Sequence, residues 1–202
     1  MINLVLKKTI IYCLFFSLIG CQHHDKVLYP NSIGNDPINV IIEIPAGTVE
    51  KWELNKKTGI IERDSVNRQP RTINYLGYPA NYGIIPNTLS AIKEGGDGDP
   101  LDVFVLGPPL KRGATQNVII IGMIEMIDNG ESDNKFLAVP YKNSSFSKID
   151  NMIDLNTEYP ELTLIITTWL KNYKGKNNHI IIKSIIDRNY ALDILSNSML
   201  TK

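Results

Sequence analysis

Cysteine is almost missing from this chain, since only Cys13 and Cys21 occur among its 202 residues. A framework of disulfides needs several cysteines, so the hydrophobic core must hold the fold. An excess of basic charge is also missing, because 21 Lys and Arg face 21 Asp and Glu. Proteins that bind nucleic acids usually carry such an excess, and we therefore expect no nucleic-acid partner. With 43% hydrophobic and 21% charged residues, the composition indicates one ordinary globular domain.

The N-terminus carries a short apolar run in place of a long one. Lys7 and Lys8 precede the run at residues 9–18, which falls short of the roughly 20 apolar residues of a membrane-spanning helix. A basic start before a short apolar run is typical of a secretory signal. The run ends in Leu-Ile-Gly-Cys at residues 18–21, which resembles the lipobox of bacterial lipoproteins. That resemblance implies that residues 1–20 are a lipoprotein signal peptide and that Cys21 carries the lipid.

A lipid on Cys21 would anchor the chain to a bacterial membrane. Gln22 follows the cysteine and does not resemble the aspartate that retains lipoproteins in the inner membrane. For a Gram-negative host we therefore expect the outer membrane, facing the periplasm. The alternative is that Cys21 is an ordinary residue behind a signal. His23 and His24 have no third ligand nearby, so we assign them no metal.

Beyond the signal, the chain divides into a polar, turn-rich tether at residues 21–37 and a folded domain at residues 38–202. Apolar and β-branched runs predict strands at 40–44, 51–54, 101–106, 117–127, 135–139 and 178–186. Helical spacing predicts helices at 161–173 and 190–200. Many short strands before late helices predict an α+β, mainly β fold with a small β-barrel flanked by helices.

Two of these elements have predictable faces. Alternation in the strand at 51–54 places Lys51 and Glu53 on one face and Trp52 on the other. The helix at 161–173 carries an apolar stripe at helical spacing, made of Leu162, Ile165, Ile166, Trp169 and Tyr173.

The densest group of acidic residues is Gly-Gly-Asp-Gly-Asp-Pro-Leu-Asp at 95–102, directly before an apolar strand. The carboxylates of Asp97, Asp99 and Asp102 repel one another, while the glycines allow the backbone to turn them toward one point. An all-oxygen set of this kind favours Mg²⁺ or Mn²⁺ over Zn²⁺. The alternative is a solvated turn, because Asp, Gly and Pro are turn residues. An EF-hand is excluded, since Leu101 and Asp102 stand where its loop needs an oxygen ligand and a glycine.

A second acidic segment, Asp-Asn-Gly-Glu-Ser-Asp-Asn-Lys at 128–135, separates two predicted strands. By itself it is typical of a hairpin tip. Beside the first loop it would add Asp128 and Asp133 to one acidic site.

Together these segments resemble family I soluble inorganic pyrophosphatases. Asp-Gly-Asp-Pro-Leu-Asp-Val at 97–103 matches the family signature D-G-D-P-hydrophobic-D-hydrophobic. The resemblance covers about two thirds of the chain, with Ile-Glu-Ile-Pro at 42–45, Lys-Trp-Glu at 51–53, Tyr-Pro-Ala-Asn-Tyr-Gly at 78–83 and Tyr-Lys at 173–174. It implies an OB-like five-stranded β-barrel flanked by helices and, among bacterial members, a homohexamer.

The resemblance also implies an activity, the hydrolysis of pyrophosphate to two phosphates by a metal-activated water. The cofactor would be Mg²⁺, with Mn²⁺ as a substitute. Asp99 would be the general base, and the metal ligands would be Asp97, Asp102 and Asp133, with Asp128 in support. Phosphate would be bound by Lys51, Arg71, Tyr82, Lys135, Tyr173 and Lys174. Glu43 and Glu53 would hold an outer metal or position the lysines, and Tyr78 would support the site.

The sequence departs from the family pattern at two places. The segment 63–71, which should hold the phosphate-binding arginine, is longer than in short bacterial members. Arg71 is the first candidate, ahead of Arg68 and Arg63. Asn129 stands where bacterial members often have an acid, which puts one outer metal contact in question.

Other interpretations stay open at this point. Lys51 and Glu53 could form a simple cross-strand ion pair, Tyr173 could belong to the core, and Lys174 could only complement the end of a helix. The chain could hydrolyse another diphosphate compound, or it could be a lipid-anchored binding protein that kept the fold and lost turnover. Six basic or phenolic groups interleaved with two acidic loops favour the enzyme.

Overall fold

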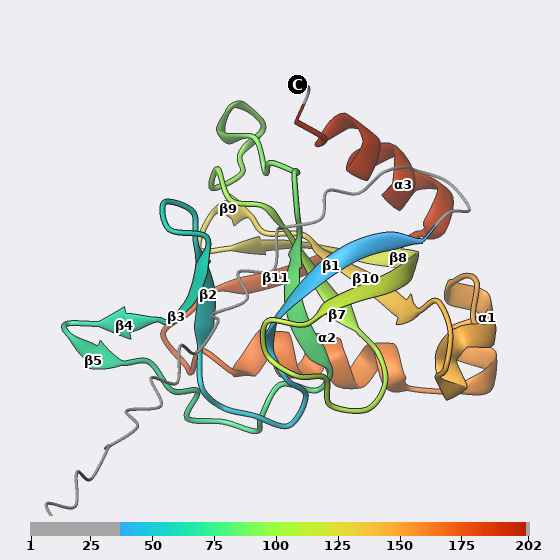
Figure 1. Ribbon diagram of the computed structural model, residues 1–202, viewed down its shortest axis with the longest axis horizontal. Coiled ribbons are helices and arrows are strands. Elements are labelled where there is room, and N and C mark those ends of the chain that lie inside the picture. Colours follow the sequence, from blue (N-terminus) through green and yellow to red (C-terminus); the bar gives the residue numbers. More distant parts are fainter. Residues whose placement is uncertain (1–36, 201–202) are drawn as a thin grey trace, which may run out of the picture.

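The computed structural model describes residues 37–200 (Figure 1), which contain one large mixed sheet with helices packed around it. The signal peptide, Cys21 and the tether up to residue 36 lie outside the described residues. The main strands are β1 (Ile38–Ile44), β6 (Asn81–Ile85), β7 (Leu101–Val105), β8 (Thr115–Asp128), β10 (Lys135–Pro140) and β11 (Ile180–Asp187), and β9 (Glu131–Ser132) pairs with β8. Within residues 37–200 no helix is both long and apolar enough to cross a membrane.

The order of strands in this sheet is β1-β6-β7-β10-β8-β11. β8 is long enough to pair with β10, with β11 and also with β1, where Ile38 lies opposite Val118. The strands β1, β6, β7, β10 and β8 therefore form a closed circuit of hydrogen-bonded neighbours. β7 and β10 are parallel, and their register sets Asp102 opposite Lys135.

The circuit closes tightly at β1 and β6. A Cβ atom added at Gly83 of β6 would lie 1.9 Å from the carbonyl oxygen of Ile41 in β1. A side chain there would push the two strands apart, so the close pairing depends on glycine.

Two apolar clusters fill the interior. One lies on the side of helix α2 (Leu162–Asn172) and includes Phe104, Leu137 and Trp169, and the other lies on the side of helix α3 (Arg188–Asn197) and includes Val103 and Phe136. Successive residues of β7 and β10 thus face opposite clusters, as alternation requires. A short helix, α1 (Met152–Glu158), contributes Leu155 to the first cluster.

Two small hairpins project from this body. β2 (Trp52–Asn55) pairs with β3 (Ile60–Arg63), and β4 (Ser65–Val66) pairs with β5 (Gln69–Pro70). Figure 1 shows the β4–β5 hairpin extending away from the main sheet. Its tip residues Asn67 and Arg68 have φ of 52° and 64°, the left-handed conformation of a two-residue hairpin loop. This hairpin accounts for the extra length of segment 63–71.

The predicted α+β, mainly β class is confirmed, and every predicted strand and helix has an observed counterpart with shifted ends. The elements α1, β6, β9 and β3–β5 were not predicted, because short strands and turn residues weaken the periodic signal there. The predicted apolar stripe of this helix was wrong at one position, because the side chain of Ile165 is 60% exposed. The buried face of α2 instead runs through Ile166, Trp169 and Leu170.

Candidate active site

A cavity of about 760 Å³ opens at the end of the sheet where the two acidic segments meet. Its wall includes thirteen of the residues predicted from the sequence: Glu43, Lys51, Glu53, Arg71, Tyr82, Asp97, Asp99, Asp102, Asp128, Asp133, Lys135, Tyr173 and Lys174. They come from seven separate stretches of the chain. The fold therefore collects the predicted polar groups in one place.

The first acidic loop is a tight turn at the start of β7. The backbone N–H of Asp99 donates to the Asp97 carboxylate at 2.9 Å, and Gly98 between them has φ of 79°. The N–H of Ser90 donates to the carbonyl of Asp99 at 2.7 Å, which closes the neck of the loop. The N–H of Ser132 donates to the carbonyl of Gly95 at 2.8 Å. This last bond links the first acidic loop directly to the second.

Lys135 lies between the two acidic loops. Its ammonium group donates to both Asp102 and Asp133, and its side chain is only 4% exposed. Burial lowers the pKa of this ammonium, but the charges of Asp102 and Asp133 outweigh burial and hold the pKa above its usual value. Lys135 is therefore a fixed positive charge at the centre of the acidic group.

Other cations around the cavity are paired in the same way. Lys51 and Glu53 lie on one face of the β2 region, as predicted, with 2.6 Å between Nζ and Oε1. Lys174, just beyond α2, pairs with Asp128. Lys56, in the β2–β3 turn, pairs with Asp99 and donates to the carbonyl of Gly98 at 3.1 Å.

Of the three candidate arginines, only Arg71 lines the cavity. It donates from Nη1 to the Asp64 carboxylate at 3.0 Å. Arg63 instead contacts Glu50 at 3.2 Å and lies over the ring of Trp52, and Arg68 is at the tip of the β4–β5 hairpin. Asp64 and Arg71 stand at the two ends of this hairpin, so its pairing brings them together. The structure thus supports Arg71.

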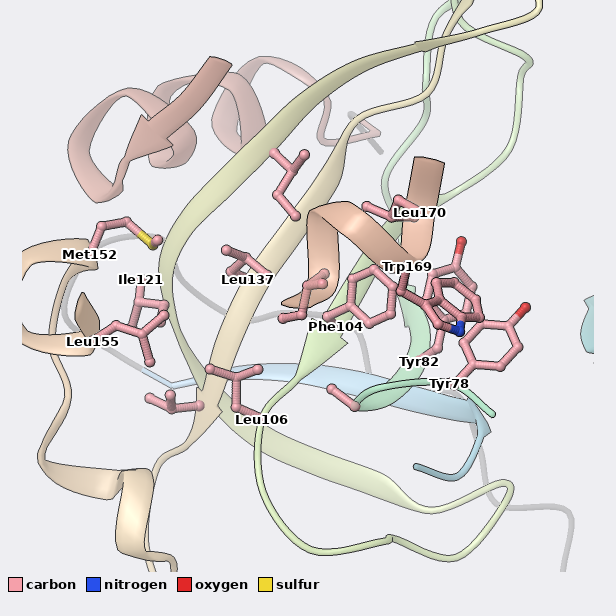
Figure 2. Close-up of a cluster of buried hydrophobic side chains, with 14 of the residues drawn as sticks. Tyr78, Tyr82, Phe104, Leu106, Ile121, Leu137, Met152, Leu155, Trp169 and Leu170 are labelled. Carbon is pink, nitrogen blue, oxygen red and sulfur yellow. The ribbon is translucent and has the colours of Figure 1, made fainter. Parts of the chain in front are cut away.

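Tyr82 and Tyr173 line the cavity, and further aromatic rings pack behind them. Figure 2 shows Tyr78 and Tyr82 beside Trp169 and Phe104, with Tyr78 packed 4.7 Å from Trp169 between ring centroids. The ring of Tyr173 stacks on Trp169 at 4.3 Å. Burial raises the pKa of the Tyr78, Tyr82 and Tyr173 hydroxyls, so all three stay protonated at neutral pH. Tyr82 and Tyr173, which line the cavity, can donate to an anion there. Tyr78 does not line the cavity and acts as packing behind Tyr82.

Glu43 occupies the floor of the cavity at the end of β1. Its carboxylate accepts a hydrogen bond from the N–H of Leu54 at 2.6 Å, which ties β1 to β2. Burial, and then the nearby charge of Asp102, raises the pKa of Glu43 to about 8. A neutral carboxyl is therefore favoured here until a cation approaches.

The donor chemistry of the cavity fits a hard divalent cation. Most of its acidic groups are carboxylates of the two acidic loops, which a backbone hydrogen bond joins, and Glu43 and Glu53 add two more from β1 and β2. Oxygen is the ligand that Mg²⁺ prefers. Within residues 37–200 no three acidic, histidine or cysteine side chains converge closely enough to form a metal-binding group by themselves. The carboxylates are held instead by lysines, and a cation would share them with these ammonium groups.

Several residues that line or support this cavity were not predicted from the sequence. Lys56, Lys57, Glu131 and Ser132 line it, and Asp64 holds Arg71. Lys56 and Lys57 carried a weak signal, because two lysines in a turn usually lie in solvent. No sequence pattern marked Asp64, since its contact with Arg71 depends on the pairing of the β4–β5 hairpin.

Comparisons with known proteins agree with this geometry. The model of the inorganic pyrophosphatase family matches residues 40–201. The chain is 36% identical to an inorganic pyrophosphatase of Campylobacter jejuni over 173 residues, which cover 83% of this chain and 94% of the relative. It is 40% identical to one from Brucella melitensis over 151 residues, covering 71% and 78%.

Solved structures give the same result. An inorganic pyrophosphatase from Coxiella burnetii superposes with a TM-score of 0.71 and 33% identity, covering 85% of this chain and 97% of that one. A vacuolar soluble pyrophosphatase from Trypanosoma cruzi, solved in complex with PPi, superposes with a TM-score of 0.76 and 27% identity, covering 84% and 70%.

Proposed function

This chain belongs to the inorganic pyrophosphatase family, and on that premise we propose how its cavity hydrolyses inorganic diphosphate to two phosphates. Membership makes the chain a metal-dependent inorganic diphosphatase. The observation that carries the proposal is the cavity itself, where two linked acidic loops face a ring of lysines, an arginine and tyrosines. That arrangement suits a substrate that is a polyanion bound together with cations.

We assign metal binding to Asp97, Asp102 and Asp133, with Asp128 in support. Mg²⁺, or Mn²⁺ in its place, would offset the phosphate charge and make a water more acidic. Glu43 and Glu53 are available for an outer cation, and the raised pKa of Glu43 means that it would lose its proton when that cation binds.

The other groups hold pyrophosphate and the attacking water. Arg71 offers a planar fork, and Lys51, Lys135 and Lys174 offer point charges that can follow the phosphate oxygens. The hydroxyls of Tyr82 and Tyr173 add neutral donors. Asp99 would orient the water or accept its proton as a general base, and Lys56 would keep the Asp99 carboxylate turned toward the cavity.

The direct test is phosphate release from pyrophosphate by the purified full-length chain in detergent. We expect release that requires Mg²⁺, stops when the metal is chelated, and is inhibited by fluoride. Tight pyrophosphate binding without chelator-sensitive release would instead support the binding-protein alternative. Faster release from a nucleotide than from pyrophosphate would support a different diphosphate substrate.

We also propose that Cys21 carries a lipid that anchors the enzyme to a bacterial membrane, facing the periplasm from the outer membrane. The basic start, the short apolar run and the Leu-Ile-Gly-Cys ending support this proposal. In a Gram-negative host, the unsubstituted chain should fractionate with outer membranes, and Cys21→Ser should release it. Equal membrane association of both chains would contradict lipidation.

The chain is further proposed to form a homo-oligomer, a hexamer by resemblance, around an OB-like five-stranded barrel. The closed circuit of β1, β6, β7, β10 and β8 supports the barrel. The exposed apolar side chains of Leu164 and Ile165 on α2 support a contact with a second copy. Light scattering of the full-length chain in detergent, corrected for bound detergent, should give the mass of an oligomer, and a monomer mass would contradict the assembly.

A further inference from the structure

Asn129 occupies the tip of the β8–β9 hairpin, at the rim of the cavity. It and Gly130 have φ of 50° and 98°, and Asn-Gly is the preferred pair for a two-residue hairpin loop of this kind. The turn therefore explains why an asparagine is tolerated here. It does not explain where the side-chain amide points, because the backbone conformation alone leaves that free.

The Asn129 side chain uses both ends of its amide. Nδ2 donates to Oδ1 of Asp128 at 3.0 Å and, more weakly, to Oδ1 of Asn178 at 3.4 Å. Oδ1 accepts from the backbone N–H of His179 at 3.2 Å, and the backbone N–H of Asn129 donates to the carbonyl of His179 at 3.0 Å. The hairpin tip is thus fixed to the segment that follows α2.

Asn178 completes a ring of contacts. Its Nδ2 donates to the backbone carbonyl of Lys174 at 2.6 Å, and the Lys174 ammonium pairs with Oδ2 of Asp128. Both oxygens of the buried Asp128 carboxylate are therefore occupied, one by Asn129 and one by Lys174. The side-chain amides of Asn129 and Asn178 thus hold Asp128 and Lys174 in place, although these two residues are 46 positions apart in the sequence.

We propose that Asn129 is a positioning residue, which fixes the Asp128–Lys174 pair and so sets how tightly the cavity binds pyrophosphate. A lysine side chain loses considerable rotamer freedom when it is ordered, and a carboxylate held at its other oxygen gives Lys174 one direction in which to lie. The neutral amide also donates to Asp128 without adding charge to the acidic loops. This inference rests on the phosphate-binding role proposed for Lys174.

Asn129→Ala, made in the full-length chain, should raise KM for pyrophosphate about 5- to 10-fold and leave kcat within about two-fold. This is expected because the Lys174 contact would stabilise the bound substrate and the transition state equally, so its loss weakens binding and leaves the chemical step unchanged. The matched control is Asn143→Ala. Asn143 has the same left-handed conformation, with φ of 61°, in the loop after β10, and it is exposed and does not line the cavity, so this control carries a similar turn penalty without the contact to Asp128. Its KM should match that of the unsubstituted chain.

Asn129→Asp supplies a readout that does not depend on turnover. Aspartate tolerates the left-handed conformation and can still accept from His179, but it cannot donate to Asp128 and places a second negative charge beside it. We expect KM for pyrophosphate to rise as in Asn129→Ala. We also expect the protein without substrate to bind Mn²⁺ at least about three-fold more tightly by electron paramagnetic resonance, because a second carboxylate joins the acidic loop.

Several outcomes would overturn the inference. One is an equal KM for Asn129→Ala and Asn143→Ala. Another is an Asn129→Asp protein that matches the unsubstituted chain in both KM and Mn²⁺ affinity, since a purely structural turn residue would behave in that way. A chain that hydrolyses pyrophosphate normally while the variants show no difference refutes this inference alone. A chain without Mg²⁺-dependent hydrolysis refutes the proposed function as well.

Discussion

Asp102→Asn will lower kcat for pyrophosphate by at least about three orders of magnitude, because it removes a charge from the proposed metal site and leaves the phosphate contacts in place. Asp102 is the second residue of β7, where the parallel register sets it opposite Lys135. Asparagine has nearly the same shape, and Asp133 remains as a partner for Lys135. The fold should therefore survive, and the loss should reflect chemistry.

The measurement is steady-state phosphate release at saturating Mg²⁺, with the melting temperature recorded for each protein. Asp193→Asn is a suitable control, because Asp193 is exposed on α3 and does not line the cavity. We expect the control to retain its full rate. Near-normal hydrolysis by Asp102→Asn would show that the acidic loop at 97–102 is not the catalytic metal site.

Lys135→Met is expected to have the largest effect on stability. The Lys135 ammonium is buried between Asp102 and Asp133, and methionine keeps much of the apolar stem while removing the charge. Two carboxylates would then face each other without a cation. Breaking a buried pair in this way costs about 3–5 kcal/mol of unfolding free energy. We also expect kcat/KM to fall by at least about 10²-fold, because a phosphate contact is lost.

Metal dependence makes this prediction specific. In chelator, Lys135→Met should melt well below the unsubstituted chain. Added Mg²⁺ should raise its melting temperature more than that of the unsubstituted chain, since the cation can replace the missing positive charge between the carboxylates. Lys183→Met, on the exposed face of β11, should change neither value. If added Mg²⁺ left the melting temperature of Lys135→Met unchanged, this result would argue against metal binding by Asp102 and Asp133.

The sequence alone was sufficient to find the acidic loop and the main classes of group around the cavity. Asp97, Asp99 and Asp102 are neighbours in the chain, and the glycines beside them report the turn directly. Alternation along the β2 region was enough to set Lys51 and Glu53 on one face, since side chains in a strand repeat every two residues. Long apolar strands such as β8 and β10 were equally visible.

Contacts between distant segments were decided by the tertiary structure. Local patterns could not choose among three arginines, because the choice depends on the β4–β5 hairpin that joins Asp64 to Arg71. They could not pair Lys174 with Asp128 or place Asn129 against His179, since those contacts join the end of β8 to the segment that follows α2. The physical reason is the separation along the chain of the residues that interact. Turns and strand faces follow from the conformational preferences of adjacent residues, whereas the charge balance of the cavity follows from how β7, β8, β10 and α2 pack together.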